Sequence, residues 1–520
     1  MKQQNYIWRT ACLLTLLSIG KIQVAAQQGL SMAGLEQMKE QRIWFHSQNA
    51  AGTALDDLQN YSDVKLNFQN TSGNFSRPQE GEGERSVGVS SEGFLNLKDA
   101  YVWGAFSFSQ ENKTDAGYNA SITDPFRGMP YYVADAYKSS WRNQYYDLKF
   151  RAATPLYWGK LAFGLEGGYQ ASLAAKQRDP RVDTRFYILK LIPGICYAIN
   201  SHHRLGVNFS YASIKEDSQM ANSDSYTDQD YYELFGLGVA VKGIGSGRTT
   251  NYYGNQFGGS MQYNYAATNL NLLLEGTYSI KAETAEVSYS TPRKIGSVKD
   301  QLGKVTMTLY TKGEKLVHHI KLDASYRMID GIQYINQRDN TESQTGWMQM
   351  YSNVRSTYET KAATLHYSLI RNRGNEYNWR VEALAYYENQ KDKYILPYSV
   401  KSHENIYMEL CGKKNFVLSD KLMKRLLVTV RGGYNKNLSG CYQYGGSHAD
   451  YLTVTQMETL DANYLMSDYW KLGAAAVYSQ QLKQESKTQV FAQVGFDYVK
   501  AEDFDFSHRS YLSVSIGCNF

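Results

Sequence analysis

The chain has 520 residues, a formal net charge of +5, 44 tyrosines, 42 glycines and a mean hydropathy of -0.51. The low hydropathy excludes a bundle of membrane-spanning helices, and so small a net charge for this length gives no indication of a nucleic-acid partner. No Pro-rich, Ser-rich or charged linker divides the sequence, so we expect one large domain.

Residues 1–26 predict a secretory signal peptide. Lys2 and Arg9 precede an apolar run, Ala11 to Ile19, and small residues at 24–26 form a cleavage site. The apolar run is shorter than the ~20 residues that a transmembrane helix needs. We therefore expect export and exclude residues 1–26 from the fold.

Four cysteines remain in the exported chain, at positions 196, 411, 441 and 518. They are too few and too scattered for a disulfide scaffold. A bridge between Cys411 and Cys441 is one interpretation, and free thiols inside strands are the preferred one.

Residues 27–60 do not alternate in polarity. Met32, Leu35 and Met38 recur at helical spacing behind Ser31, a suitable N-cap, and residues 49–52 break the pattern. Two interpretations stay open: a periplasmic extension, or a plug folded into the lumen of a barrel. The candidate plug residues are Asn49 and Gly52.

From about residue 61 to the end, apolar and polar residues alternate with a period of two. Leu161, Phe163 and Leu165, for example, alternate with Lys160, Gly164 and Glu166, and similar stretches follow at 204–211, 269–278, 319–327 and 379–388. Each spans ~10 residues, the length that a tilted strand needs to cross a bilayer, whereas strands of soluble sandwiches average ~5 to 6. The pattern predicts an all-β, transmembrane antiparallel β-barrel over residues 61–520.

The predicted connections alternate in length. Tight ones are expected at Lys98-Asp99, 200–202, Ala267-Thr268 and 312–315, and long polar ones near 112–140, 215–230, 329–345, 390–403 and 435–449. Short periplasmic turns and long extracellular loops give such an alternation. Counting forward and backward disagrees near 231–253 or 437–470, and we expect about 14 to 16 strands, since bacterial barrels have even counts.

The last residues, Arg509 to Phe520, form one more alternating strand with a terminal phenylalanine. This ending resembles the C-terminal strand by which outer-membrane barrels are recognised for insertion. The resemblance implies the barrel-assembly machinery and outer-membrane lipid as partners.

Several phrases carry a further resemblance. They include residues 77–81 (RPQEG), 91–94 (SEGF), 102–108 (VWGAFSF), 124–131 (DPFRGMPY), 134–135 (AD), 179–181 (DPR) and 193–194 (PG). They resemble an uncharacterised family of Gram-negative outer-membrane barrels, a domain of unknown function near the fatty-acid-transporter-like barrels. Residues 49–55 also resemble the N-terminal hatch of the latter, with Ala50 in place of its proline. The resemblance implies fold and location, and brings no established catalytic or binding residue.

Charged residues at lumen-facing positions are candidates for a constriction. They share a parity on two predicted strands: Lys321, Asp323 and Arg327 on one, and Arg380, Glu382 and Glu388 on the other. A mixed-charge constriction orients solutes in a pore. The alternative is a hydrated barrel wall whose charges pair.

Residues 124–135 lie in a long connection and contain two prolines, an arginine and two tyrosines. An inward-folded gating loop and a plain surface loop both fit this composition. The gating-loop candidates are Asp124, Arg127 and Asp135.

We expect no enzyme, no cofactor and no metal. His508 and Ser510 share one face of the last strand and slightly resemble a barrel lipid-A deacylase, but no fixed acidic partner is evident. The pairs His202-His203 and His318-His319 would point to opposite faces of a strand, which excludes chelation through one surface.

The sequence thus predicts a porin-like outer-membrane barrel that passes a small or hydrophobic solute. Two alternatives stay open: a non-conducting accessory barrel that partners another outer-membrane protein, and, more remotely, a lipid hydrolase. A TonB-dependent transporter would need a larger plug and more strands than ~460 barrel residues comfortably provide.

Overall fold

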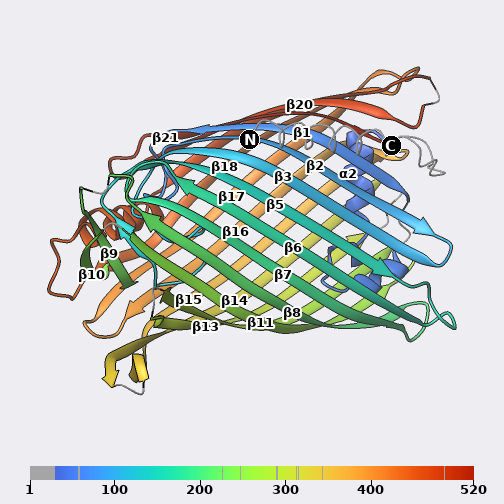
Figure 1. The fold of residues 1–520 in the computed structure, drawn as a ribbon. Coiled ribbons are helices and arrows are strands. Elements are labelled where there is room, and N and C mark those ends of the chain that lie inside the picture. The colour runs from blue at the N-terminus through green and yellow to red at the C-terminus, as the bar shows by residue number, and fades with distance from the viewer. Residues whose placement is uncertain are drawn as a thin grey trace, which may run out of the picture.

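The computed structural model describes residues 30–520, except 57–58, 225, 246, 289–290, 312, 314, 342–343 and 485. The predicted signal peptide lies outside the described residues. Eighteen strands form one antiparallel sheet in chain order, and pairing of the first with the last closes it into a barrel (Figure 1). The barrel strands are β1 (Tyr61–Ser72), β2 (Gly83–Leu97), β3 (Ala100–Ala116), β5 (Ser139–Ala153), β6 (Leu161–Lys176), β7 (Arg181–Ala198), β8 (His203–Ala221), β11 (Gly247–Ala266), β12 (Leu270–Ser288), β13 (Arg293–Thr311), β14 (Leu316–Thr341), β15 (Gln344–Arg373), β16 (Glu376–Tyr394), β17 (Ser399–Ser419), β18 (Lys424–Gln443), β19 (Tyr469–Gln481), β20 (Gln489–Ala501) and β21 (His508–Asn519).

The all-β barrel is as predicted, but the count of 14 to 16 strands is wrong. Some of the expected long polar connections are largely strand. The segment 329–345, for instance, is filled by the ends of β14 and β15, which pair as far as Thr341 and Gln344, and 390–403 shrinks to residues 395–398. Hydrogen-bonded ladders continue beyond the apolar part of a strand, because backbone pairing does not require an apolar outer face.

The two ends of the barrel differ. At the short-turn end, which also holds both ends of the barrel sheet, strands join at Lys98-Asp99, 199–202, 267–269 and the other tight connections. The turns predicted from the sequence at these three places are confirmed. At the opposite loop end lie the longer connections, chiefly 73–82, 117–138, 222–246 and 444–468.

The outer face of the barrel is apolar at mid-strand. Exposed outward side chains include Phe163, Val207, Val305, Leu410 and Ile516. The side chains that alternate with them point inward, as the period of two requires. Among the described residues, none of the helices is both long and apolar enough to span a bilayer.

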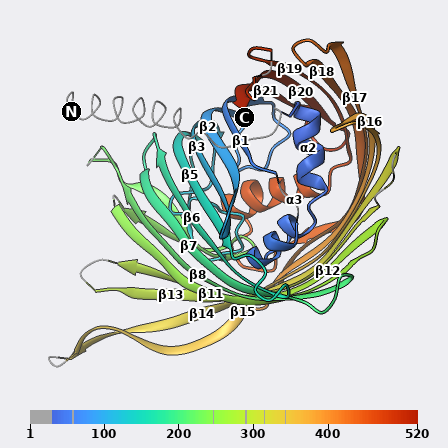
Figure 2. The same ribbon diagram turned by 90° about the vertical axis from the view of Figure 1, so that its right-hand side faces the viewer.

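Residues 30–56 lie inside the barrel at the short-turn end (Figure 2). Helix α2 (Met32–Glu40) has Ser31 as its N-cap, as predicted, and packs against β16. The 3-10 helices η2 (Trp44–His46) and η3 (Ala50–Leu55) follow, and η3 packs against β5, β6 and β7. Trp44 and Ile43 are fully buried in this interface.

The loop end is filled by its own connections. A small sheet joins β4 (Val133–Asp135) and β10 (Val239–Gly245) to β9 (Gln229–Gly236). A π-helical turn η4 (Thr453–Glu458) and helix α3 (Thr459–Leu465) lie within the ring of strands (Figure 2). An apolar cluster that includes Ile122, Tyr131, Leu234, Ile329 and Met457 holds these connections against the wall.

Candidate functional site

The N-terminal segment lies flush against three strands that present glycine at the point of contact. A Cβ added to Gly164 of β6 would lie 2.1 Å from the Ala51 nitrogen, and one on Gly194 of β7 would lie 2.2 Å from Asn49 Oδ1. Gly206 of β8 would likewise meet Asn49 and Trp44. Only residues without a side chain allow so close an approach of two backbones.

Asn49 is the polar centre of this contact and is fully buried. Its Nδ2 donates to the carbonyls of Ile195 and Val207, at 3.0 and 3.2 Å, and to Gln262 Oε1 at 3.0 Å. Its Oδ1 accepts from Ala51 N at 3.1 Å. One side chain therefore caps η3 and joins it to the wall. Gly52, the other plug candidate, instead packs within the segment, where a Cβ would meet Trp44 at 2.2 Å.

Charged groups join helix α2 to the opposite wall. Arg380 of β16 bonds Glu40 through both terminal nitrogens and pairs with Glu382 at 2.5 Å. His319 Nδ1 lies 2.6 Å from Glu40 Oε1, and Ser31 Oγ donates to Glu376 Oε2 at 2.6 Å. These contacts hold helix α2 at both of its ends.

Asp56 ends the segment in a partly buried position, beside a cavity of about 390 Å³. Its Oδ2 accepts a hydrogen bond from Phe45 N at 2.7 Å. Burial raises the pKa of Asp56 to about 7, and the hydrogen bond and the nearby Arg42 only partly oppose this. The carboxyl group therefore changes charge near neutral pH.

At the loop end, residues 117–138 fold into the lumen. Arg127 forms ion pairs with Glu216 of β8 and, at 2.6 Å, with Glu283 of β12, both of which are buried. Arg327 of β14 donates to the Arg127 carbonyl at 2.9 Å and pairs with Asp300 at 2.8 Å. Strands distant in sequence therefore converge on one loop residue.

The other two gating-loop candidates have different surroundings. Asp135 of β4 forms a buried ion pair with Lys176 at the end of β6, and burial raises the pKa of Asp135 despite this partner. Asp124 caps its own loop, where its Oδ1 accepts from Phe126 N at 2.9 Å. Only Arg127 bridges the loop to several strands.

A second buried ion-pair group ties α3 to the first long loop. Asp461 accepts from Arg77 Nε at 2.5 Å and from Lys401 Nζ at 2.8 Å, and Glu458 also pairs with Lys401 at 2.5 Å. Burial alone would raise the pKa of Asp461, but Lys401 and Arg77 outweigh it and hold that pKa well below its usual value. The carboxylate stays charged at neutral pH.

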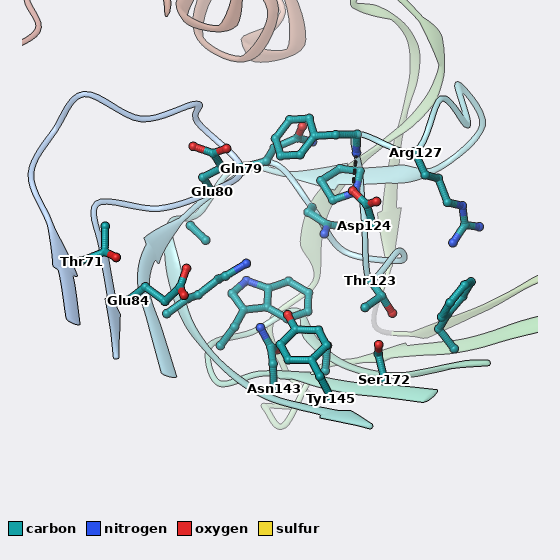
Figure 3. Close-up of a pocket in the computed structure, with 18 of the residues that line it drawn as sticks. Thr71, Gln79, Glu80, Glu84, Thr123, Asp124, Arg127, Asn143, Tyr145 and Ser172 are labelled. Atoms are coloured by element: carbon teal, nitrogen blue, oxygen red, sulfur yellow. Dashed lines mark hydrogen bonds between the residues drawn. The ribbon is translucent and has the colours of Figure 1, made fainter. Parts of the chain in front are cut away.

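Between the two closed ends lies a hollow that we call the lumen chamber. It consists of two cavities, of about 790 and 620 Å³, both of which are lined by Gln69, Thr71, Tyr464 and Tyr511. In Figure 3 the loop residues Gln79, Glu80 and Asp124 lie on one side of the larger cavity, and Thr71, Asn143, Tyr145 and Ser172 of the strands on another. Volumes in this range suit a small-molecule ligand.

The constriction candidates predicted from sequence do not form one ring. Each has a charged neighbour: Lys321 with Asp323 at 3.6 Å, Arg327 with Asp300, Arg380 with Glu40 and Glu382, and Glu388 with His403 at 2.9 Å. Arg380 contacts Glu40 of α2, whereas Arg327 and Glu388 both line a cavity of about 280 Å³ beside α3. The candidates therefore lie in at least two separate parts of the lumen.

Several residues of these networks are not singled out by any sequence pattern. The main ones are Arg77, Glu216, Glu283, Lys401 and Asp461. Glu216 and Glu283 do lie at lumen-facing positions of alternating strands, which is a signal, but nothing in the sequence connects them with Arg127. Asp461 lies on helix α3, and no pattern in the sequence of this helix indicates that it is buried inside the barrel.

The structure offers no support for the other chemistries considered. Within the described residues, no hydrogen bond joins His508 to Ser510: His508 Nδ1 contacts Ser507 Oγ at 3.1 Å, and Ser510 Oγ contacts Ser72 Oγ at 3.0 Å. No group of three potential ligands gathers for a metal ion in the part of the chain that is described. The four described cysteines are free, and Cys411 and Cys441 face Arg431 and Ser402 rather than each other.

A family model described as a family of unknown function, DUF6850, matches residues 50–520. The chain belongs to this family. The family match includes all eighteen barrel strands and η3 with its contact on β6 and β7, so it extends well beyond the phrases at 77–194.

A search of curated proteins found no match. Solved structures with a similar course include the ferric preacinetobactin receptor BauA of Acinetobacter baumannii (9% identity, 89% of this chain and 81% of that one, TM-score 0.40). They also include the unliganded ferric citrate transporter FecA (9% identity, 89% of this chain and 78% of that one, TM-score 0.41). A third is the P. putida toluene transporter TodX (9% identity, 91% of this chain and 92% of that one, TM-score 0.31). At TM-scores this low, none of them supports a conclusion about function.

Proposed function

We propose that the chain is an outer-membrane barrel that passes a solute through its lumen, and that it is closed at rest by residues 30–56 at the periplasmic end and by inward-folded loops at the outer end. The apolar outer face supports a lipid setting, and the alternation of short turns and long loops supports this orientation. The observation that carries the proposal is the lumen chamber in a barrel whose short-turn end holds residues 30–56 and whose loop end holds inward-folded connections.

The two closures differ in how they would open. Residues 30–56 form one continuous segment joined to β1, so they can leave the lumen as a unit without unpairing any barrel strand. The contacts to be broken include those of Asn49 and Arg380 and the hydrogen bonds that Arg151 donates to carbonyls of the segment. We therefore assign the gate to this segment, the plug of the sequence prediction.

The test is single-channel conductance in planar lipid bilayers, for the full mature chain and for a variant that lacks residues 27–60. We expect rare steps from the full chain and frequent steps from the deletion variant. Folding of both is checked by heat-modifiable migration on gels. Folded barrels that remain silent in both forms would contradict the proposal and favour a non-conducting accessory barrel.

One observation favours a second candidate, lateral release of a hydrophobic solute into the membrane, as in the fatty-acid-transporter-like barrels. The pairing of β7 with β8 is interrupted at Ile192 and Pro193, because proline has no N–H to donate, and Asn49 binds carbonyls next to this gap. Transfer of a fluorescent fatty acid into protein-containing vesicles that show no ionic conductance would support this candidate. Conductance without such transfer would contradict it.

A further inference from the structure

The wall of the lumen chamber combines aromatic rings with polar groups. Trp141 and Tyr145 line the larger cavity, Tyr407 and Tyr469 the smaller one, and Tyr511 faces both. A tyrosine ring offers an apolar face for C–H groups and a hydroxyl at its edge for hydrogen bonds. Such a wall suits a solute that has both apolar faces and many hydroxyls.

One buried hydrogen-bonding atom at this wall has no protein partner. Asn143 is only 4% exposed, and its Nδ2 donates to Glu111 Oε1 at 2.9 Å. Its Oδ1 has no hydrogen-bond partner within the described part of the chain. The atom has less than 1 Å² of accessible surface, so it lies within the wall and is not itself a contact for a solute.

The charges of the chamber do not select for one sign. The larger cavity is lined by three carboxylates and three basic groups: Glu80, Glu84 and Asp124 against Lys113, Arg127 and Arg509. Because Arg127 is neutralised by Glu216 and Glu283, which lie outside the lining, three carboxylates and two basic groups remain, and the excess of one sign is small. In the smaller cavity Lys471 lies 3.9 Å from Glu409, and Arg431 neutralises Asp497. A balanced field of this kind disfavours selection of a simple anion or cation.

The shape of the chamber limits the size of the solute. Each cavity falls within the ~300 to 1,000 Å³ that is usual for sites of small molecules. Because the two cavities share Thr71, Tyr464 and Tyr511, they adjoin and fit an elongated molecule of several rings. Neutral charge, many hydroxyls, apolar ring faces and an elongated form are together the properties of an oligosaccharide.

We propose that the lumen chamber binds a neutral oligosaccharide of a few sugar units. The inference rests on the proposed function, since it names the class of solute that the closed barrel holds between its two ends. Tyr511 and the other aromatic rings stack on the sugar faces, and polar side chains that line both cavities, Gln69 and Thr71, form hydrogen bonds with sugar hydroxyls.

The test is isothermal titration calorimetry of the full mature chain in detergent. The probes are neutral oligosaccharides of two to six units built on glucose, mannose, galactose or xylose. Trialanine serves as a zwitterionic probe and sodium phosphate as an anionic one. We expect saturable heats from at least one of the saccharide series and none from trialanine or phosphate.

Matched variants locate the site. Tyr511→Ala removes a ring that lines both cavities. Thr71→Val is a milder variant, because Thr71, which pairs with Tyr511 between β1 and β21, also lines both cavities but loses only its hydroxyl. We expect Tyr511→Ala to weaken saccharide binding by about 3- to 10-fold and Thr71→Val by less. Tyr278→Ala is the control, because Tyr278 is 54% exposed on the outer face, and it should leave binding unchanged.

The outcomes separate this inference from the proposed function. Saturable binding of trialanine or phosphate alone, binding that is unchanged in both Tyr511→Ala and Thr71→Val, or no binding by any probe would overturn the oligosaccharide assignment. If the variant without residues 27–60 still conducts in that case, the transport proposal stands. If the deletion variant is also silent, both proposals fail.

Discussion

The two ends of the barrel are closed by different means. At the short-turn end a single segment, residues 30–56, lies on Gly164, Gly194 and Gly206 and is held by many polar contacts, among them the buried Glu40–Arg380 ion pair. At the loop end several separate connections interlock through buried ion pairs centred on Arg127 and Asp461. Both closures contain buried charges, but the first is one continuous segment that can leave as a unit, whereas the second opens only if several connections part from one another. The comparison indicates a movable gate at one end and a fixed cap at the other.

The largest effect is expected from Arg127→Ala, which removes the ion pairs that hold residues 117–138 in the closed loop end. The substitution leaves the Glu216 carboxylate buried without a cation and leaves Glu283 with Lys281 as its one remaining cationic partner, and such a loss costs about 3 to 5 kcal/mol. We expect much faster proteolysis within residues 117–138 and a lower unfolding temperature. Arg185→Ala is the control, because its side chain is 69% exposed beside Asp183, and it should change neither. A cap that resists protease equally in both variants would contradict the interlocked closure.

Asp56 should make the gate depend on pH. Its folded pKa of about 7 lies above the ordinary value of 3.8 for an aspartate, so the docked segment binds a proton more tightly than the released one. The stabilisation is fully present below pH ~4 and is lost as pH rises through ~7, by at most about 1.4 kcal/mol per pH unit. We expect the open probability of the full chain to rise between pH 4 and 7 and then to level off.

The matching variant for this prediction is Asp56→Asn, which cannot ionise. Its open probability should stay low and flat over the same range of pH. An equally steep pH response in Asp56→Asn would assign the effect to another group and leave the gate itself unaffected.

A smaller effect is expected from Gly164→Ala, which adds a side chain to one of the three glycines on which the N-terminal segment lies. The new methyl group would overlap the backbone of Ala51, and such overpacking costs about 1 to 3 kcal/mol. We expect more frequent conductance steps with no change in protease resistance of the cap. Gly276→Ala on β12 is the control, because a Cβ there meets nothing within 4 Å. Equal conductance of the two variants would argue against docking of the segment on these glycines.

The smallest effect is expected from Lys138→Ala at the rim of the cap. Lys138 pairs with Glu82 at 2.8 Å, but both side chains are about half exposed, at 50% and 45%. Exposed pairs of this kind contribute less than about 1 kcal/mol. Protease resistance and unfolding temperature should therefore stay close to those of the native chain, and a loss as large as that of Arg127→Ala would show that the cap is not held by its buried pairs.

The sequence is most informative where one strand carries its own signal. Alternation places Val381 outside and Arg380 and Glu382 inside, because successive side chains point to opposite faces whatever strand lies next to them. The helix after Ser31 is likewise predictable, because its cap and its apolar spacing are local. Strand ends are less predictable, since β14 and β15 continue as a paired ladder through residues whose composition is that of a loop.

The sequence by itself determined the all-β class, the two faces of each strand and the helix behind Ser31. Only the tertiary structure decided the number of strands and the partners of each inward charge. Closure depends on the register of β1 with β21, and Arg127 meets Glu216 and Glu283, which lie 89 and 156 residues away along the chain. Contacts of this kind depend on how the whole barrel closes, whereas alternation depends only on the geometry of a single strand.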